Sequence, residues 1–336
     1  MKDTDIHLVS RESVILFASM LKEVDSDIYG LLRQATIPND IDTETDYRFL
    51  PESSLKNTLD LLAGKLSNQT LGWLFLRACK EKYIPRFVNK LSGCSTVKHA
   101  IERFCQQLNH ESTGAKTSLQ YAGETWWFVR EKNGVDEAWF KYAEMFSVIF
   151  MCELIRGLTN DKWRPERVGI QSPCIDEFTK LPSMELAQFF LERPMTAVEI
   201  NRATLALPVS VSRPMGALDN ARQEQPVDSL SFTQQFTLAI TPYLSMGKLP
   251  IKIAAEILRM NVRTLQRKLA AENIIYKQFI EDLVFKEVSK RIIETDDAIT
   301  QIAIRYGYSD GAHFTRSFKR IYGVSPLQYR KQNLDK

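Results

Sequence analysis

Two groups of basic and polar residues near the end of the chain each fall on one face of a short predicted helix. In the major groove of DNA, Arg and Lys donate hydrogen bonds to guanine O6 and N7, and Gln pairs with adenine N6 and N7. These residue types at this spacing indicate contact with DNA bases. The two groups consist of Arg263, Thr264, Gln266, Arg267, Lys268, His313, Arg316, Lys319 and Arg320.

Side-chain chemistry predicts two different roles for these residues and for the nearby Arg330. The residues that we expect at base edges are Arg263, Gln266, Arg267 and Arg316. Phosphates take half or more of the hydrogen bonds in protein–DNA complexes. The residues that we expect at phosphates are Lys268, Lys319, Arg320 and Arg330.

The first group needs two short helices to position it. Apolar residues recur at helical spacing on both sides of Asn261, a residue type that caps helix N-termini. Ala255 is small enough for the two helices to cross closely there. The apolar residues expected between these helices are Ile251, Ala254, Leu258, Val262, Leu265 and Leu269.

A second helix pair repeats this pattern for the second group. Gly307 suits the left-handed backbone that ends a helix, and Ser309 or Asp310 can begin the next one. Gly323 and Pro326 then predict a stop and a restart. The apolar residues expected inside this pair are Ile299, Ile302, Ala303, Tyr306, Phe314, Phe318 and Ile321.

Residues 276–294 predict a helix between the two pairs, because their apolar residues have helical spacing and no Gly or Pro interrupts them.

The basic residues of the chain are concentrated near its C-terminus. Residues 241–336 hold 17 Lys and Arg against 10 Asp and Glu, whereas the rest holds 27 against 31. A basic segment on a mildly acidic body is typical of nucleic-acid binding. The alternative is that each basic face is only a solvated surface.

The run from Ile299 to Arg330 resembles the signature of AraC/XylS-type bacterial transcription regulators. Tyr308 and Thr315 replace the Phe and Ser that are usual there, and Gly311 and Ala312 lie where some members place base-reading side chains. The matching segments are Ile302-Ala303, Gly307-Tyr308-Ser309, Phe314-Thr315-Arg316-Ser317-Phe318-Lys319, Gly323-Val324-Ser325-Pro326 and Tyr329-Arg330.

This resemblance implies a sequence-specific regulator, by family habit an activator, with double-stranded DNA and RNA polymerase as partners. In the family, a rigid helix joins two helix-turn-helix motifs. The recognition helices can then enter successive major-groove segments about 34 Å apart. Nonspecific architectural DNA binding remains an alternative, and it would depend on salt but hardly on sequence.

The length of 336 residues predicts about two domains. We expect a regulatory domain over residues 1–207, a Pro-containing linker over 208–228 and an all-α DNA-binding domain with two helix-turn-helix motifs over 229–336.

The regulatory domain reads as α+β, mostly helical with a small sheet. Predicted helices cover residues 12–22, 28–34, 52–66, 71–80, 97–108, 138–158 and 184–191. Predicted strands cover residues 116–121, 124–132, 167–171 and 196–205, with a hairpin around Ala122-Gly123.

Residues 10–206 are similar to the arabinose-binding-type domain of one branch of this family, and many relatives answer to other small molecules. Aromatic and basic residues that could bind an effector are Trp73, Phe75, Trp126, Phe128, Trp139, Phe140, Phe146, Phe150, Arg77, Lys82, Arg86 and Arg130. The alternative is that the aromatic residues are core and the basic ones are surface. A second alternative is a protein-interaction or homodimerisation module without a metabolite ligand.

Enzyme, metal and membrane functions find no support in the sequence. Phosphate loops, nucleophile elbows and paired-His motifs are absent. The five cysteines lack metal or disulfide spacing, so we expect buried free thiols. The chain begins with acidic residues, and its longest apolar run, Met145 to Ile155, is too short for a bilayer of about 30 Å. We therefore expect a cytoplasmic protein with no cofactor.

Overall fold

The computed structural model describes residues 6–43, 47–91, 93–175, 178, 180–181, 184–209, 230–247 and 249–334. Contacts divide the chain into two compact units. One unit comprises His7–Asp42 and Ser54–Ser229, and the other comprises Met1–Ile6, Thr43–Ser53 and Leu230–Lys336. Most of the predicted linker, residues 210–228, lies outside the described residues, so the predicted domain boundaries stay a prediction. The part of the chain that is described has no helix long and apolar enough to span a membrane.

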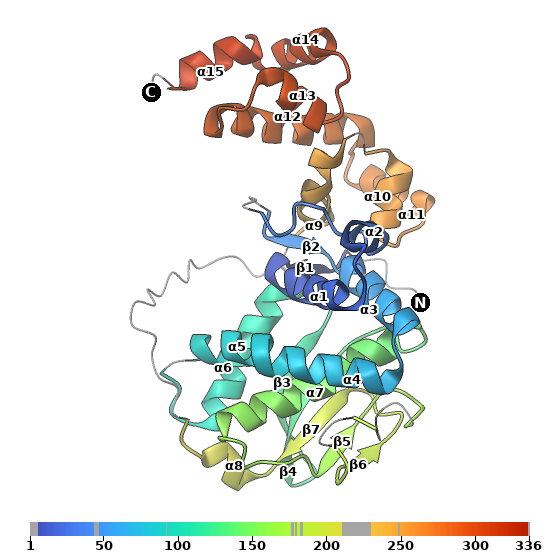
Figure 1. Cartoon of the computed structure of the whole chain (residues 1–336), viewed down its shortest axis with the longest axis vertical. Helices are drawn as coiled ribbons and strands as arrows, with labels where there is room; N and C mark the ends of the chain where they lie inside the picture. Colours follow the sequence, from blue (N-terminus) through green and yellow to red (C-terminus); the bar gives the residue numbers. More distant parts are fainter. Residues whose placement is uncertain are drawn as a thin grey trace. The chain divides into compact units, whose positions relative to one another are not determined.

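The first half of the larger unit is helical (Figure 1). Ser10, Asp27, Ser67 and Thr96 cap the N-termini of four of these helices, because each side chain accepts a hydrogen bond from a first-turn N–H. A short strand, β1 (Leu8–Ser10), precedes them. The helices are α1 (Arg11–Val24), α2 (Ile28–Gln34), α3 (Ser53–Lys65), α4 (Asn68–Ala78), the π-helix η1 (Cys79–Tyr83), α5 (Ile84–Lys90) and α6 (Val97–Glu111).

A five-stranded sheet with the order β3-β4-β7-β5-β6 completes this unit. Gly123 and Glu124 both have positive φ and form the two-residue turn between β3 and β4, one residue later than the predicted Ala122-Gly123. Phe104 of α6 contacts Phe128 of β4 and Phe150 of α7, so helices and sheet share one core. The elements are β3 (Lys116–Ala122), β4 (Thr125–Glu131), α7 (Phe140–Leu158), β5 (Arg167–Gly169), β6 (Gln188–Phe190), β7 (Thr196–Ile200) and α8 (Arg202–Ala206).

The predicted α+β fold of this part is confirmed, with local errors. The helix predicted over residues 184–191 is wrong, because Gln188–Phe190 forms strand β6 and pairs in parallel with β5. The strand predicted to Leu205 ends at Ile200, where Asn201 caps α8. Helix α5 was not predicted, although its Pro85 lies in the first turn, where no intrahelical N–H is needed.

One buried carboxylate in this unit has several structural partners. The Glu144 carboxylate is fully buried and accepts hydrogen bonds from the Gln171 and Ser172 N–H groups and from the Thr196 hydroxyl. Four of the cysteines are buried, as predicted, and Cys174 is exposed. Burial raises the pKa of the Cys105 thiol to about 11, so this thiol stays protonated at neutral pH.

The second unit is mainly helical, and Phe285 lies at its centre. This ring is fully buried and contacts Tyr308, Phe314 and Phe318. The C-terminal elements are α9 (Phe232–Ile240), the 3₁₀ helix η3 (Thr241–Met246), α10 (Ile251–Ile257), α11 (Val262–Ala271), α12 (Tyr276–Glu294), α13 (Ile299–Arg305), α14 (Gly311–Tyr322) and α15 (Pro326–Leu334). The helix predicted over residues 276–294 is therefore present with those bounds.

Candidate nucleic-acid interface

Helices α10 and α11 form the first helix pair. Ala254, Ala255, Leu265 and Leu269 are buried, as their spacing predicted. The Met260 N–H donates to the Ala255 carbonyl over 2.8 Å and closes the end of α10. The side chain of Asn261 then accepts from the Arg263 N–H at 2.8 Å. This cap begins α11, so the basic face starts in its first turn.

Helices α13 and α14 form the second pair with matching end contacts. The Tyr308 N–H donates to the Ala303 carbonyl over 2.9 Å, in the same way as in the first pair. Gly307 has a φ of 81°, which confirms the predicted left-handed position. Of the two predicted caps, Asp310 begins α14 by accepting from the Ala312 N–H at 2.8 Å.

The prediction that Ile321 points inward is wrong, because this side chain is 39% exposed. Tyr322 takes the interior position instead. Its ring stacks on Phe318 with a centroid separation of 4.6 Å, and its hydroxyl donates to the Phe285 carbonyl at 2.9 Å. Tyr322 is half-buried, so its ring packs on its neighbours while its polar group keeps a partner.

Gly307→Ala is expected to lower the free energy of unfolding by about 1–2 kcal/mol, because a left-handed backbone brings Cβ too close to the carbonyl oxygen. Gly311→Ala is the matched control, since Gly311 lies in α14 and an added Cβ would meet nothing within 4 Å. We expect this control to be neutral or stabilising. Chemical denaturation of the full chain, followed by helical circular dichroism, measures both, and equal losses would contradict the argument.

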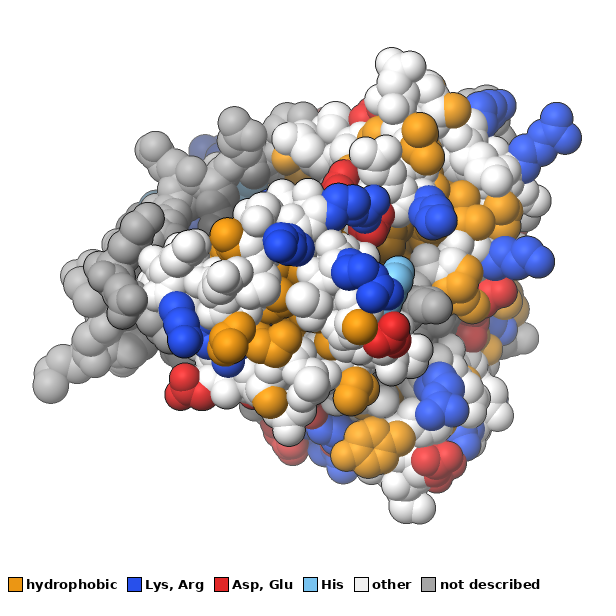
Figure 2. Space-filling model, turned by 90° about the horizontal axis from the view of Figure 1, so that it is seen from above, with side chains coloured by type: hydrophobic (Ala, Val, Ile, Leu, Met, Phe, Trp, Pro, Cys, Tyr) orange, Lys and Arg blue, Asp and Glu red, His pale blue; other side chains and the backbone are white. Residues whose placement is uncertain are grey.

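Most of the predicted DNA-contacting residues lie on the free faces of α11 and α14. In Figure 2, Lys and Arg side chains are spread over the visible face of the molecule, with apolar side chains between them. Thr264 and Lys268 are half-buried. The exposed members are Arg263, Gln266, Arg267, His313, Arg316, Lys319 and Arg320.

Three of the predicted phosphate contacts have protein partners. The ammonium group of Lys268 lies 5.1 Å from the centre of the Phe232 ring. Arg320 forms an ion pair with Glu281 of α12. Arg330 donates to the carbonyls of Ile292 and Asp297 at 2.8 and 2.7 Å, so its guanidinium ties α15 to the end of α12. Arg330 is therefore a structural residue of this unit.

A hollow of about 480 Å³ lies between α13 and the start of α14. Gly311 and Ala312 line it together with Thr300 and Arg316. The hollow follows from the small side chains at the first two positions of α14. Thr300 was not selected from the sequence, because a single polar residue on a first helix carries no distinctive spacing.

A segment from the first third of the chain belongs to the same unit as these helices. Strand β2 (Phe49–Pro51) packs on α9, and Leu50 is fully buried. The Ser53 hydroxyl donates to the carbonyl of Ile257, the last residue of α10. The sequence did not indicate this contact, since it joins residues about 200 positions apart through one short, irregular segment.

Residues 254–332 match a protein family described as a helix-turn-helix domain. The chain is 34% identical over 87 residues to the HTH-type transcriptional regulator VirS of Mycobacterium tuberculosis, covering 26% of each chain. It is 32% identical over 79 residues to the porin thermoregulatory protein EnvY of Escherichia coli, covering 24% of this chain and 31% of EnvY. The chain thus matches about a quarter to a third of the length of these relatives.

Among solved structures, the transcriptional regulator CdpR of Pseudomonas aeruginosa matches 82% of this chain and 91% of its own, with a TM-score of 0.36 and 14% identity. A TM-score of this size does not establish a shared fold. The family match begins within α10 and covers α11, α12, α13 and α14, and the named relatives are AraC-family transcription regulators. The C-terminal part of this chain is therefore an AraC-type helix-turn-helix domain.

Proposed function

We propose that this chain is a sequence-specific, DNA-binding transcription regulator in which α11 and α14 are two recognition helices. The observation that carries this proposal is the repeated geometry. Each helix follows a tightly closed turn, begins at a side-chain cap and exposes a basic face. The match of residues 254–332 to a helix-turn-helix family supports the same function.

Helix α12 gives the two recognition helices a rigid connection. Its 19 residues correspond to a length of about 28 Å, close to the repeat of about 34 Å between major-groove segments on one side of DNA. Phe285 and Val288 are buried on the side of α12 that holds the second pair. One chain would then contact two groove segments without a partner copy.

The positions of the exposed hydrogen-bond donors on α11 and α14 separate base contacts from phosphate contacts. Arg263, Gln266 and Arg267 lie in the first turns of α11, and Arg316 lies in the middle of α14. We propose that these four side chains contact base edges, because the N-terminal half of a recognition helix enters the groove most deeply. Lys319, Lys268 and Arg320 would contact phosphates, with Arg320 leaving Glu281 to do so.

We further propose that the N-terminal domain controls DNA binding. Packing of β2 and Ser53 among the C-terminal helices supports this, since these residues belong to the N-terminal half of the sequence. An effector can act only by binding the DNA-competent state more tightly than the silent state. A protein-interaction or homodimerisation role remains the second candidate, and activation through RNA polymerase is the expected output.

Selection of genomic DNA fragments with the purified full-length chain at physiological salt tests the DNA-binding proposal. We expect an enriched motif of two segments about one helical turn apart. Affinity for the selected site should also exceed affinity for random DNA by about 10³-fold or more. Equal affinity for both, falling with salt alone, would favour architectural binding and contradict the proposal.

A further inference from the structure

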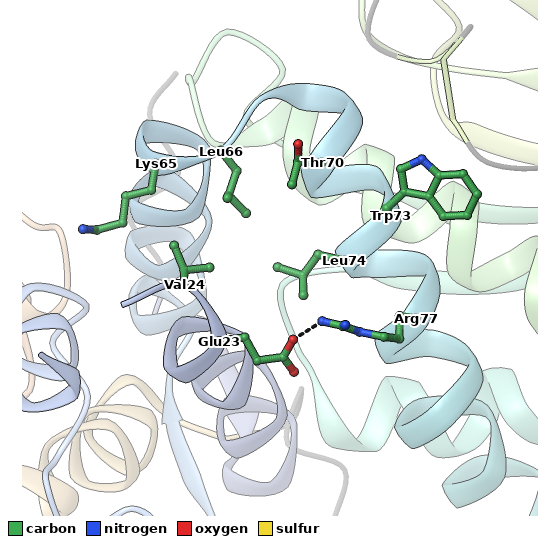
Figure 3. A pocket seen from close by; sticks show the side chains of 8 residues that line it. All are labelled: Glu23, Val24, Lys65, Leu66, Thr70, Trp73, Leu74 and Arg77. Carbon is green, nitrogen blue, oxygen red and sulfur yellow. Dashed lines mark hydrogen bonds and ion pairs between the residues drawn. The ribbon is translucent and has the colours of Figure 1, made fainter. Parts of the chain in front are cut away.

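A cavity of about 710 Å³ lies among the ends of α1, α3 and the middle of α4. Figure 3 shows Val24, Leu66 and Leu74 pointing into a common space, with Trp73 at its rim. Ligand pockets in proteins have volumes of about 300–1,000 Å³ and mainly apolar walls with a few polar groups. The volume and lining of this cavity fit that description.

Trp73 is the wall residue that most needs a partner. Its side chain is 57% exposed, whereas Phe75, Phe128, Phe140 and Phe150 are buried in the core. An exposed tryptophan leaves a large apolar surface in water, and covering it with a ligand ring is favourable. Of the aromatic residues considered for an effector site, Trp73 is the most exposed, and it lines this cavity.

The charged residues that line the cavity carry an excess of positive charge, because the lining holds two cations, Lys65 and Arg77, and one carboxylate, that of Glu23. Arg77 forms an ion pair with Glu23. Lys65 pairs at 2.7 Å with Asp25, which lies outside the lining. Figure 3 shows Glu23 and Arg77 meeting at one side of the cavity. A ligand carboxylate would supply the missing negative charge and could accept two hydrogen bonds from the Arg77 guanidinium.

The helix that carries Trp73 and Arg77 has an irregular continuation. Helix α4 passes directly into the π-helix η1, which begins at Cys79, two residues after Arg77. Short π-helical segments are rare and occur frequently at functional sites. This irregularity supports a binding role independently of the charge and the exposed ring.

We propose that this cavity is the effector site and that it binds a small acid with an apolar ring. The ring would pack on Trp73, Leu66 and Leu74, and the carboxylate would pair with Arg77. This inference rests on the proposed regulatory function, because it identifies the effector class and the place where the effector acts.

Binding can be tested in the full chain with 8-anilinonaphthalene-1-sulfonate, a fluorescent aromatic anion. We expect saturable binding, displaced by 4-phenylbutyrate but about tenfold more weakly by the uncharged 4-phenylbutanol. Trp73→Ala should weaken binding, and Arg33→Gln, on the exposed face of α2, should leave it unchanged. Absence of saturable binding, or equal displacement by the acid and the alcohol, would overturn the proposal.

Two further variants separate a binding role from a structural one. Arg77→Gln should weaken 4-phenylbutyrate about tenfold or more, whereas Glu23→Gln should strengthen it, because Glu23 competes with the ligand for Arg77. If these residues only held α1 and α4 together, both variants would lose the same ion pair and change binding in the same direction. Changes in the same direction would overturn the assignment of the carboxylate site.

The regulatory effect is measured as the change that 4-phenylbutyrate causes in affinity for the selected DNA. We expect a change of about fivefold or more in the original chain and a loss of this change in Arg77→Gln. An equal response in Arg77→Gln would overturn the role of this cavity as the effector site. If DNA selection finds no motif, the proposal that the chain is a transcription regulator is contradicted. The displacement measurements still test the separate proposal that the cavity binds a small acid.

Discussion

Phe285→Ala is expected to lower the free energy of unfolding of the C-terminal unit by about 3–5 kcal/mol. The side chain is fully buried in α12 and contacts three rings of the second helix pair, those of Tyr308, Phe314 and Phe318. Removing it leaves a cavity at the junction of the connecting helix with that pair. The surrounding rings lie on α14 and on the turn before it, so they cannot close the space without moving α14.

The positions of the tryptophans make this effect measurable in the full chain. All five tryptophans lie between residues 73 and 163, so their fluorescence reports only the N-terminal part. We expect the unfolding transition followed by circular dichroism of the helices to move to a lower denaturant concentration. The transition followed by tryptophan fluorescence should stay at the same concentration. Ile304→Ala, at a residue 69% exposed on α13, is the control and should change stability by less than about 0.5 kcal/mol. A similar small change for Phe285→Ala would contradict the packing argument.

Arg267→Ala and Arg316→Ala are each expected to cost about 1–3 kcal/mol at the selected DNA site, which corresponds to roughly 5- to 150-fold in affinity. Both guanidinium groups project from exposed helix faces, so their removal leaves the domain folded. Each variant should also relax base preference at one position of the site. Binding assays on the selected site and on a set of single-base variants measure both effects.

Lys319→Ala supplies the contrast, because a phosphate contact carries no base information. We expect this variant to weaken selected and random DNA by similar factors and to reduce the salt dependence by about one ion. Arg33→Ala, which removes an exposed arginine from the N-terminal part, should leave both affinities unchanged. Equal losses on selected and random DNA for Arg267→Ala, Arg316→Ala and Lys319→Ala would refute the division into base and phosphate contacts.

Local patterns were sufficient to predict most of the C-terminal helices. Asn261, Asp310 and Gly307 act within a few residues of their own positions, and each has the predicted cap or left-handed backbone. The uninterrupted apolar spacing of residues 276–294 gave the bounds of α12. The exposed basic faces followed from the same periodicity, because burying the apolar stripe leaves the remaining residues in water.

Where local patterns did not predict the structure, long-range contacts decided it. Gln188–Phe190 has helical spacing but forms a strand, because β5 offers a parallel partner. Ile321 and Tyr322 are both apolar enough for the core, and the Phe285 carbonyl and the neighbouring rings select Tyr322. The sequence predicts a phosphate contact for Arg330, whereas in the structure its guanidinium donates to the backbone carbonyls of Ile292 and Asp297.

The sequence by itself therefore determined the class of the C-terminal domain, the caps of its helices and their exposed basic faces. These properties depend on neighbours within one or two helical turns. The tertiary structure alone decided that β2 and Ser53 pack among the C-terminal helices, and that Trp73, Arg77 and Lys65 surround one cavity. Those properties depend on which distant segments of the chain pack together. The packing of the whole unit decides which long loops close, and such contacts leave no periodic pattern in the sequence.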